Sequence, residues 1–187
     1  MRIVGGISKG IPLQVPNNGV RPTSDRVREA LFSILGELVL DASCIDLFAG
    51  SGSLGIEALS RGAKSCMFVD NSPESCGAIT YNLEKARLAG GTVRREHVGP
   101  FLSKTSGECD LIFADPPYKV EGLVEELVKS DALTRLLLPD GILIIEAPSR
   151  DVDFPCHEEI ELLTVRKYGD SQLILYRRDN NIDVNDI

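Results

Sequence analysis

The segment Asp46–Gly55, DLFAGSGSLG, decides the fold. It continues the strand-like run CIDLFA (44–49) into a G-x-G-x-x-G pattern that starts at Gly50 and opens a helical stretch. Glycines here permit a tight turn and close approach of a ligand, and the free N–H groups of the following helix favour negative charge. Asp70 ends the next strand-like run, 20 residues after Gly50. A carboxylate at that place can accept both hydroxyl hydrogens of a ribose.

Strand-like and helix-like segments alternate along most of the chain. Short apolar runs predict strands over 44–49, 65–70, 91–96, 110–115 and 141–147. The last segment, 159–178, instead predicts an antiparallel hairpin around a Tyr-Gly-Asp turn. We therefore expect an α/β, Rossmann-like fold whose seven-stranded, mostly parallel sheet ends in an antiparallel hairpin, as in the methyltransferase variant.

Three regions are expected. Residues 1–22 lie outside the α/β repeat and predict a small β-hairpin extension. We expect residues 23–178 to form the α/β domain, and residues 179–187 to form an acidic, disordered tail. The domain opens with a helix capped by Thr23, Ser24 or Asp25. Its predicted apolar stripe contains Val27, Leu31, Ile34, Leu35 and Leu38.

Composition excludes several classes of protein. The chain of 187 residues is 43% apolar and carries a net charge of −8, which argues against a generic nucleic-acid binder. Its first 35 residues nevertheless carry five basic and two acidic residues. The five cysteines form no CxxC pair, so we expect free thiols in a reducing cytoplasm and no metal site. No membrane span or signal peptide is predicted.

The second motif is ADPPY (114–118), at the end of a predicted strand. Ligands of open α/β sheets bind at the carboxyl ends of strands, so Asp115 and the Gly50 loop are expected on the same rim. The residues alone leave two cofactors open, because NAD and S-adenosylmethionine both present an adenosine to this corner. Asp46 is awkward beside a pyrophosphate and useful near a sulfonium, and its alternative role is to fix the loop.

The motifs together resemble a known family. DLFAGSG and DPPY resemble the S-adenosylmethionine-dependent amino-methyltransferases. With RPTSDRVREALFSIL (21–35) and KYGDSQLILY (167–176), nearly the whole chain resembles the RsmD family of bacterial 16S rRNA guanine-N2 methyltransferases. The acidic tail has no counterpart in this resemblance.

The resemblance implies a set of site residues. It places the target amine at Asp115, Pro116, Pro117 and Tyr118. It places S-adenosylmethionine at Asp46, Phe48, Ala49, Gly50, Ser51, Gly52, Asp70, Asn71, Ser72, His97 and Val98. His97 stands where the family usually has an acidic or amide residue at the adenine edge, and it either accepts from the adenine amine or is merely exposed.

The resemblance also implies the partner, 16S rRNA within the small ribosomal subunit or an assembly intermediate. Phosphate contacts are expected from Arg2, Lys9, Arg21, Thr23, Arg26 and Arg28. We expect a cytoplasmic monomer. The alternatives are an amino-methyltransferase acting on DNA adenine N6 or on a protein glutamine amide, and an NAD-binding Rossmann protein; a non-enzymatic RNA chaperone fits the intact DPPY motif poorly.

Overall fold

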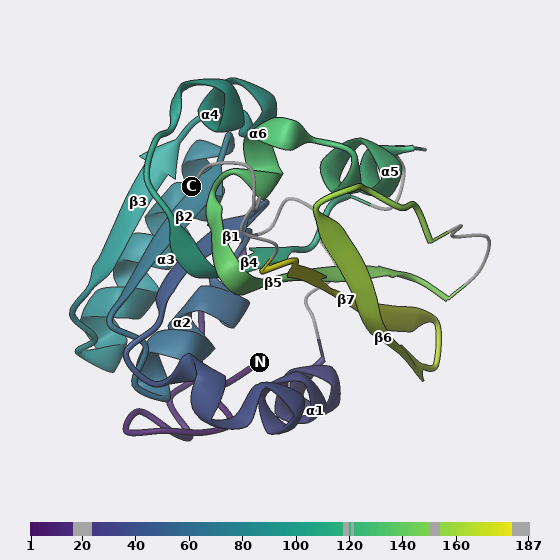
Figure 1. The fold of residues 1–187 in the computed structure, drawn as a ribbon. Helices are drawn as coiled ribbons and strands as arrows, with labels where there is room; N and C mark the ends of the chain where they lie inside the picture. Colours follow the sequence, from purple (N-terminus) through teal and green to yellow (C-terminus); the bar gives the residue numbers. More distant parts are fainter. Residues whose placement is uncertain (17–23, 118–119, 121, 150–153, 181–187) are drawn as a thin grey trace.

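The computed structural model describes residues 1–16, 24–117, 120, 122–149 and 154–180. Within these residues a seven-stranded sheet runs through the centre of the molecule (Figure 1). Its strands are β1 (Ser43–Leu47), β2 (Ser65–Asp70), β3 (Gly91–Arg95), β4 (Cys109–Ala114), β5 (Leu137–Pro148), β6 (Ile160–Tyr168) and β7 (Ser171–Arg178). Their order is β3-β2-β1-β4-β5-β7-β6, and only the pairs that involve β7 are antiparallel. The predicted fold class and the C-terminal hairpin are confirmed.

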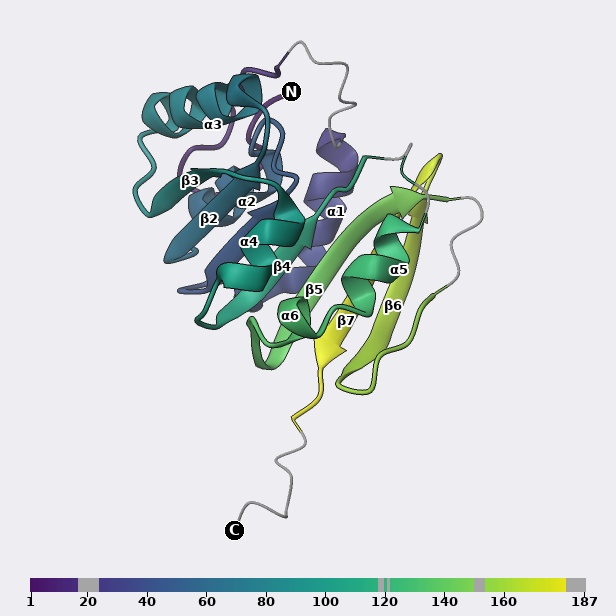
Figure 2. The same cartoon turned by 90° about the horizontal axis from the view of Figure 1, so that it is seen from above.

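Helices cover both faces of the sheet (Figure 2). One face carries α1 (Asp25–Leu35), the 3₁₀ turn η1 (Gly36–Val39), α2 (Ser53–Ser60) and α3 (Pro73–Ala86). The other face carries α4 (Val98–Lys104), α5 (Leu123–Val128) and α6 (Asp131–Thr134). The central strands are buried on both faces, which explains their nearly continuous apolar sequences.

The helix ends follow from their local residues, and the predicted cap of α1 is confirmed. Ser24 caps α1 by accepting a hydrogen bond from the Val27 N–H at 3.2 Å. Ser72 caps α3 in the same way, with Pro73 as the first helical residue. Gly62 follows α2 with φ +102°, a conformation that glycine adopts without strain.

The predicted stripe of α1 is partly wrong. Ile34 and Leu38 are 40% and 57% exposed, whereas Phe32 and Arg28 are buried. Ile34 lies inside the α-helix, outside the buried face that is formed by Val27, Arg28, Leu31, Phe32 and Leu35. Leu38 lies beyond the end of the α-helix, in a 3₁₀ turn with a different angular spacing of side chains, so the helical stripe does not extend to it.

The N-terminal segment, residues 1–16, is less regular than the predicted hairpin. It folds back on itself through one antiparallel bridge between Arg2 and Pro12, and no strand is assigned in it. The segment is instead attached to the helices: the Val4 N–H donates to Glu57 Oε2 at 2.9 Å, and Ser8 Oγ donates to the Ala86 carbonyl at 2.9 Å. Among the described residues, none of the helices is long and apolar enough to cross a membrane.

Candidate active site

Three strand ends meet where the order of the strands reverses. Leu47 of β1 pairs with Val69 of β2 on one side and with Ala114 of β4 on the other. The residues that follow on these strands therefore lie at the same level: Phe48, Asp70 and Asp115. The rim predicted from the two motifs exists, and it lies at the switch point where α/β sheets bind ligands.

The glycine loop is shaped by Asp70. The Gly50 N–H donates to Asp70 Oδ2 at 2.8 Å, and the Ser72 N–H donates to Asp70 Oδ1 at 2.9 Å. One carboxylate thus fixes the loop after β1 and the start of α3. The turn also holds Phe48 at φ +57°, a strained conformation for a bulky residue and one that occurs at functional sites.

A cavity of about 270 Å³ opens over this rim. Most of the residues that line it were predicted from the sequence: Phe48, Gly50, Asp70, Asn71, Ser72, His97, Val98, Asp115 and Pro117. Its lining contains the carboxylates of Asp70, Asp115 and a third residue, Glu96, but neither Lys nor Arg among the described residues. An acidic cavity suits a cationic ligand and disfavours a pyrophosphate.

Glu96 and Ser75 line the cavity but were missed in the sequence analysis. Glu96 directly follows β3 and lies next to His97, and both residues line the cavity. The structure therefore brings an acidic side chain to the region after the third strand where the resemblance expects the adenine edge. His97 stays a predicted cofactor contact. Its side chain is exposed, and its Nδ1 accepts from Asn71 Nδ2 at 3.1 Å. A neutral ring in this arrangement carries its proton on Nε2, which would donate rather than accept.

Some predicted site residues do not line the cavity. The cofactor residues Ala49, Ser51 and Gly52 are buried in the glycine loop, and Pro116, which was predicted to hold the target amine, is buried next to Asp115. Tyr118 lies outside the described residues.

Asp46 holds the start of α2 through a buried hydrogen bond and does not line the cavity. Its side chain is 2% exposed, and its Oδ2 accepts from the Gly55 N–H at 2.9 Å. Burial raises the pKa of this carboxyl to about 8, and the nearby Asp70 charge adds to the shift. The role of Asp46 as a cofactor contact is corrected: of the two interpretations, the structure favours the one in which it holds the loop against α2.

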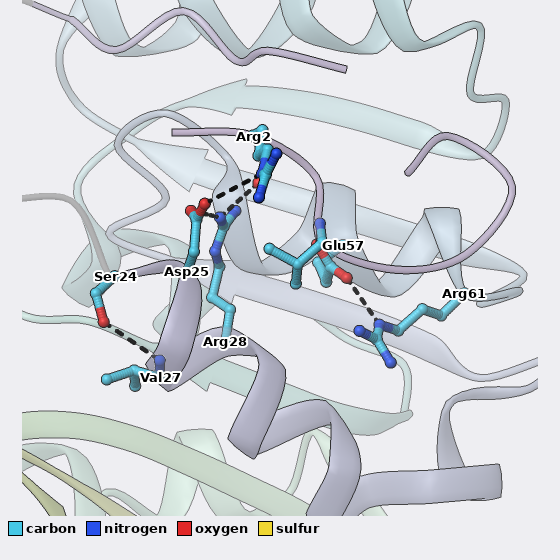
Figure 3. Close-up of polar contacts among 8 residues, drawn as sticks. Arg2, Ser24, Asp25, Val27, Arg28, Glu57 and Arg61 are labelled. Atoms are coloured by element: carbon cyan, nitrogen blue, oxygen red, sulfur yellow. Dashed lines mark hydrogen bonds and ion pairs between the residues drawn. The ribbon is translucent and has the colours of Figure 1, made fainter. Parts of the chain in front are cut away.

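Arg28 is likewise not a surface residue, although we predicted a phosphate contact. Its side chain is fully buried, and its Nη2 donates at 2.5 Å both to the Arg2 carbonyl and to Asp25 Oδ1 (Figure 3). Burial lowers the pKa of the guanidinium, while Glu57 and Asp25 oppose this shift. Arg28 therefore joins α1 to the N-terminal segment, and the prediction that it contacts RNA is wrong because the helix turns it inward.

The other predicted RNA contacts are divided between two places. Arg26 is exposed in the first turn of α1, and Arg2 is exposed beside it, with its Nε 3.6 Å from Asp25 Oδ2. Lys9 is exposed next to Ser8, which contacts the carboxyl ends of α2 and α3, at the end of the sheet away from the cavity. Arg21 and Thr23 lie outside the described residues.

Comparisons with known proteins show the family of the chain. A family model described as "Conserved hypothetical protein 95" matches residues 1–177. The chain is 35% identical to "Ribosomal RNA small subunit methyltransferase D" of Escherichia coli over 148 residues, covering 79% of this chain and 74% of that protein. It is 32% identical to the protein of the same name from Haemophilus influenzae, covering 95% and 93%.

A solved structure from Escherichia coli, "Putative methyltransferase yhhF", is also similar. It superimposes with a TM-score of 0.85 at 32% sequence identity, covering 97% of this chain and 99% of that chain. The match therefore includes the N-terminal segment, the rim and the C-terminal hairpin. The chain belongs to the RsmD family of ribosomal RNA small subunit methyltransferases.

Proposed function

We propose that this protein transfers a methyl group from S-adenosylmethionine to the exocyclic N2 amine of a guanine in 16S rRNA of the small ribosomal subunit. The observation that carries the proposal is the rim on which Asp70 and Asp115 meet across the glycine loop. The family of rRNA small-subunit methyltransferases supports the substrate class.

The cavity supports S-adenosylmethionine over NAD. Asp70, Glu96 and Asp115 contribute negative charge to its lining, and no described lining residue is a lysine or arginine. A pyrophosphate would meet these carboxylates unfavourably, whereas an ammonium or sulfonium would be stabilised by them. Asp70 already accepts two backbone N–H groups, and each of its oxygens keeps a second lone pair for a ribose hydroxyl.

The DPPY motif is suited to holding an amine. When bound, S-adenosylmethionine supplies an electrophilic methyl group. Asp115 and the Pro116 carbonyl accept the two hydrogens of the amine, so that its lone pair turns away from the base and toward the methyl group. Two successive prolines stiffen this stretch, and the acceptors are in position before the base enters. Catalysis would then rest on positioning: the methyl C–S bond breaks as the N–C bond forms, S-adenosylhomocysteine leaves, and the methylated nitrogen gives one proton to water.

Tritiated-methyl transfer to small subunits that lack the modification tests the proposal. We expect nucleoside analysis to find N2-methylguanosine; N6-methyladenosine, or label in a protein glutamine, would overturn the substrate assignment. Isothermal titration should show binding of S-adenosylhomocysteine and no binding of NAD.

The role of Asp115 is tested separately. Asp115→Ala should lower methyl transfer at least 100-fold and leave the affinity for S-adenosylhomocysteine within about threefold. Asp110→Asn is the matched control, because Asp110 lies at the other end of β4, where its Oδ2 accepts from Ser43. Turnover by Asp115→Ala within a few-fold of wild type would refute the mechanism.

A further inference from the structure

The side chain of Asn82 joins the glycine loop to the N-terminal segment. Asn82 lies on α3 and is fully buried. Its Nδ2 donates to the Ser51 carbonyl at 3.0 Å and to the Gln14 carbonyl at 2.9 Å, and its Oδ1 accepts from the Gln14 N–H at 2.7 Å. Both of its N–H groups are used, one on each side of the junction.

The two sides of this junction have different tasks. Ser51 lies between Gly50 and Gly52, the residues that shape the loop beneath the cavity. Gln14 belongs to the N-terminal segment, residues 1–16, which also contains Arg2. The sequence continues from Gln14 toward Arg21 and the start of α1. If the backbone of Ser51 or Gln14 moves, then Asn82 must move with it or lose a hydrogen bond. A lost bond would leave a buried polar atom unpaired, which costs free energy.

Other contacts attach the N-terminal segment without touching the loop. Ser60 Oγ accepts from the Ser8 N–H at 3.0 Å and donates to the Gly5 carbonyl at 2.7 Å. Ser60 is the last residue of α2, at the far end from the glycine loop. Asn82 is therefore a buried polar residue that joins the N-terminal segment to the glycine loop, whereas Ser60 is a buried polar residue that holds the segment without contacting the loop.

We propose that Asn82 is a positioning residue through which binding of the cofactor and binding of RNA favour each other. The inference rests on the proposed function, since it takes the loop as the cofactor site and the N-terminal segment as part of the RNA-facing surface. Cofactor bound at the loop holds the backbone of Ser51 in place, Asn82 carries this restraint to Gln14, and the N-terminal segment is held in the position that binds RNA. By linkage, RNA must raise cofactor affinity by the same factor.

The test measures this factor. The affinity for small subunits that lack the modification is determined with and without saturating S-adenosylhomocysteine. We expect wild type to bind at least fivefold more tightly with it. Asn82→Ala should reduce this ratio to about one and weaken S-adenosylhomocysteine binding about tenfold. Ser60→Ala should keep the wild-type ratio even if its RNA affinity falls.

A surface variant guards against misfolding of Asn82→Ala. The Gln14 side chain is exposed. Gln14→Pro removes the backbone N–H that donates to Asn82 Oδ1, and it leaves the hydrogen bond from Asn82 Nδ2 to the Ser51 carbonyl. It should lower the ratio and keep S-adenosylhomocysteine affinity within twofold. A wild-type ratio of one, or an unchanged ratio in Gln14→Pro and Asn82→Ala, overturns the inference while the proposed function stands. Failure of wild type to bind S-adenosylhomocysteine overturns both.

Discussion

The buried carboxyl of Asp46 should make the stability of this protein fall as the pH rises. Its pKa is raised to about 8 in the folded protein, because the side chain is buried beneath the glycine loop. In the unfolded chain an aspartate titrates near its ordinary pKa of about 3.9. Between these two values the folded protein holds a proton that the unfolded chain has released. The stabilisation that the proton on Asp46 contributes is therefore fully present below about pH 4, decreases as the pH rises to about 8, and is absent above it.

One proton sets the size of the effect. Each pH unit within this window costs about 1.4 kcal/mol of unfolding free energy, so about 4 kcal/mol is lost between pH 5 and pH 8. Asp46→Asn removes the ionisation and keeps an oxygen that accepts from the Gly55 N–H. The unfolding free energy of the variant should therefore lack this decrease, so that the difference between variant and wild type grows by about 4 kcal/mol from pH 5 to pH 8.

Urea unfolding of both proteins at pH 5, 6, 7 and 8 measures this difference. The m-value, which is the slope of the unfolding free energy against urea concentration, should be equal in the two proteins. Equal m-values would mean that both expose the same surface on unfolding. A stability difference that stays constant from pH 5 to pH 8 would refute the reasoning, because Asp46 would then be ionised in the folded protein.

Two further predictions use matched pairs of residues. Gly55→Ala places a Cβ 2.4 Å from a ring carbon of Phe68 on β2 and should lower the unfolding free energy by about 1–3 kcal/mol. Gly77→Ala meets nothing within 4 Å and should raise the unfolding free energy by about 0.5–1 kcal/mol. The midpoints of urea unfolding measure both changes, and equal effects of the two variants would contradict the packing argument. Arg28→Met removes the hydrogen bonds from the buried guanidinium to the Arg2 carbonyl and to Asp25, and it should lower the unfolding free energy by about 1–3 kcal/mol, since Glu57 keeps its ion pair with Arg61. The exposed Arg26→Ala should leave the unfolding free energy within about 0.5 kcal/mol and weaken RNA binding severalfold. Thermal unfolding and RNA titration of both variants check this prediction. An Arg28→Met variant that is as stable as wild type but binds RNA weakly would show that Arg28 contacts RNA at the surface.

The motifs were readable because they are local. The glycine spacing, Asp70 at a strand end and the prolines after Asp115 each follow from what one turn of backbone requires, and the sheet order then brings them together. Glu96 was missed because the strand was predicted to include it, whereas β3 ends at Arg95 and leaves Glu96 beside His97 in the lining of the cavity.

The sequence by itself determined the alternation of strands and helices, the antiparallel hairpin and the two motifs of the rim. Only the tertiary structure decided which charged residues face the solvent. Arg28 and Asp46 look like surface and ligand residues in sequence, yet both are buried and paired, because a helix phase and a strand face place them under neighbouring elements. Asn82 carried no signal at all, since its three hydrogen bonds join backbone groups 68 and 31 residues away. Local spacing cannot predict contacts that exist only after the chain has folded over itself.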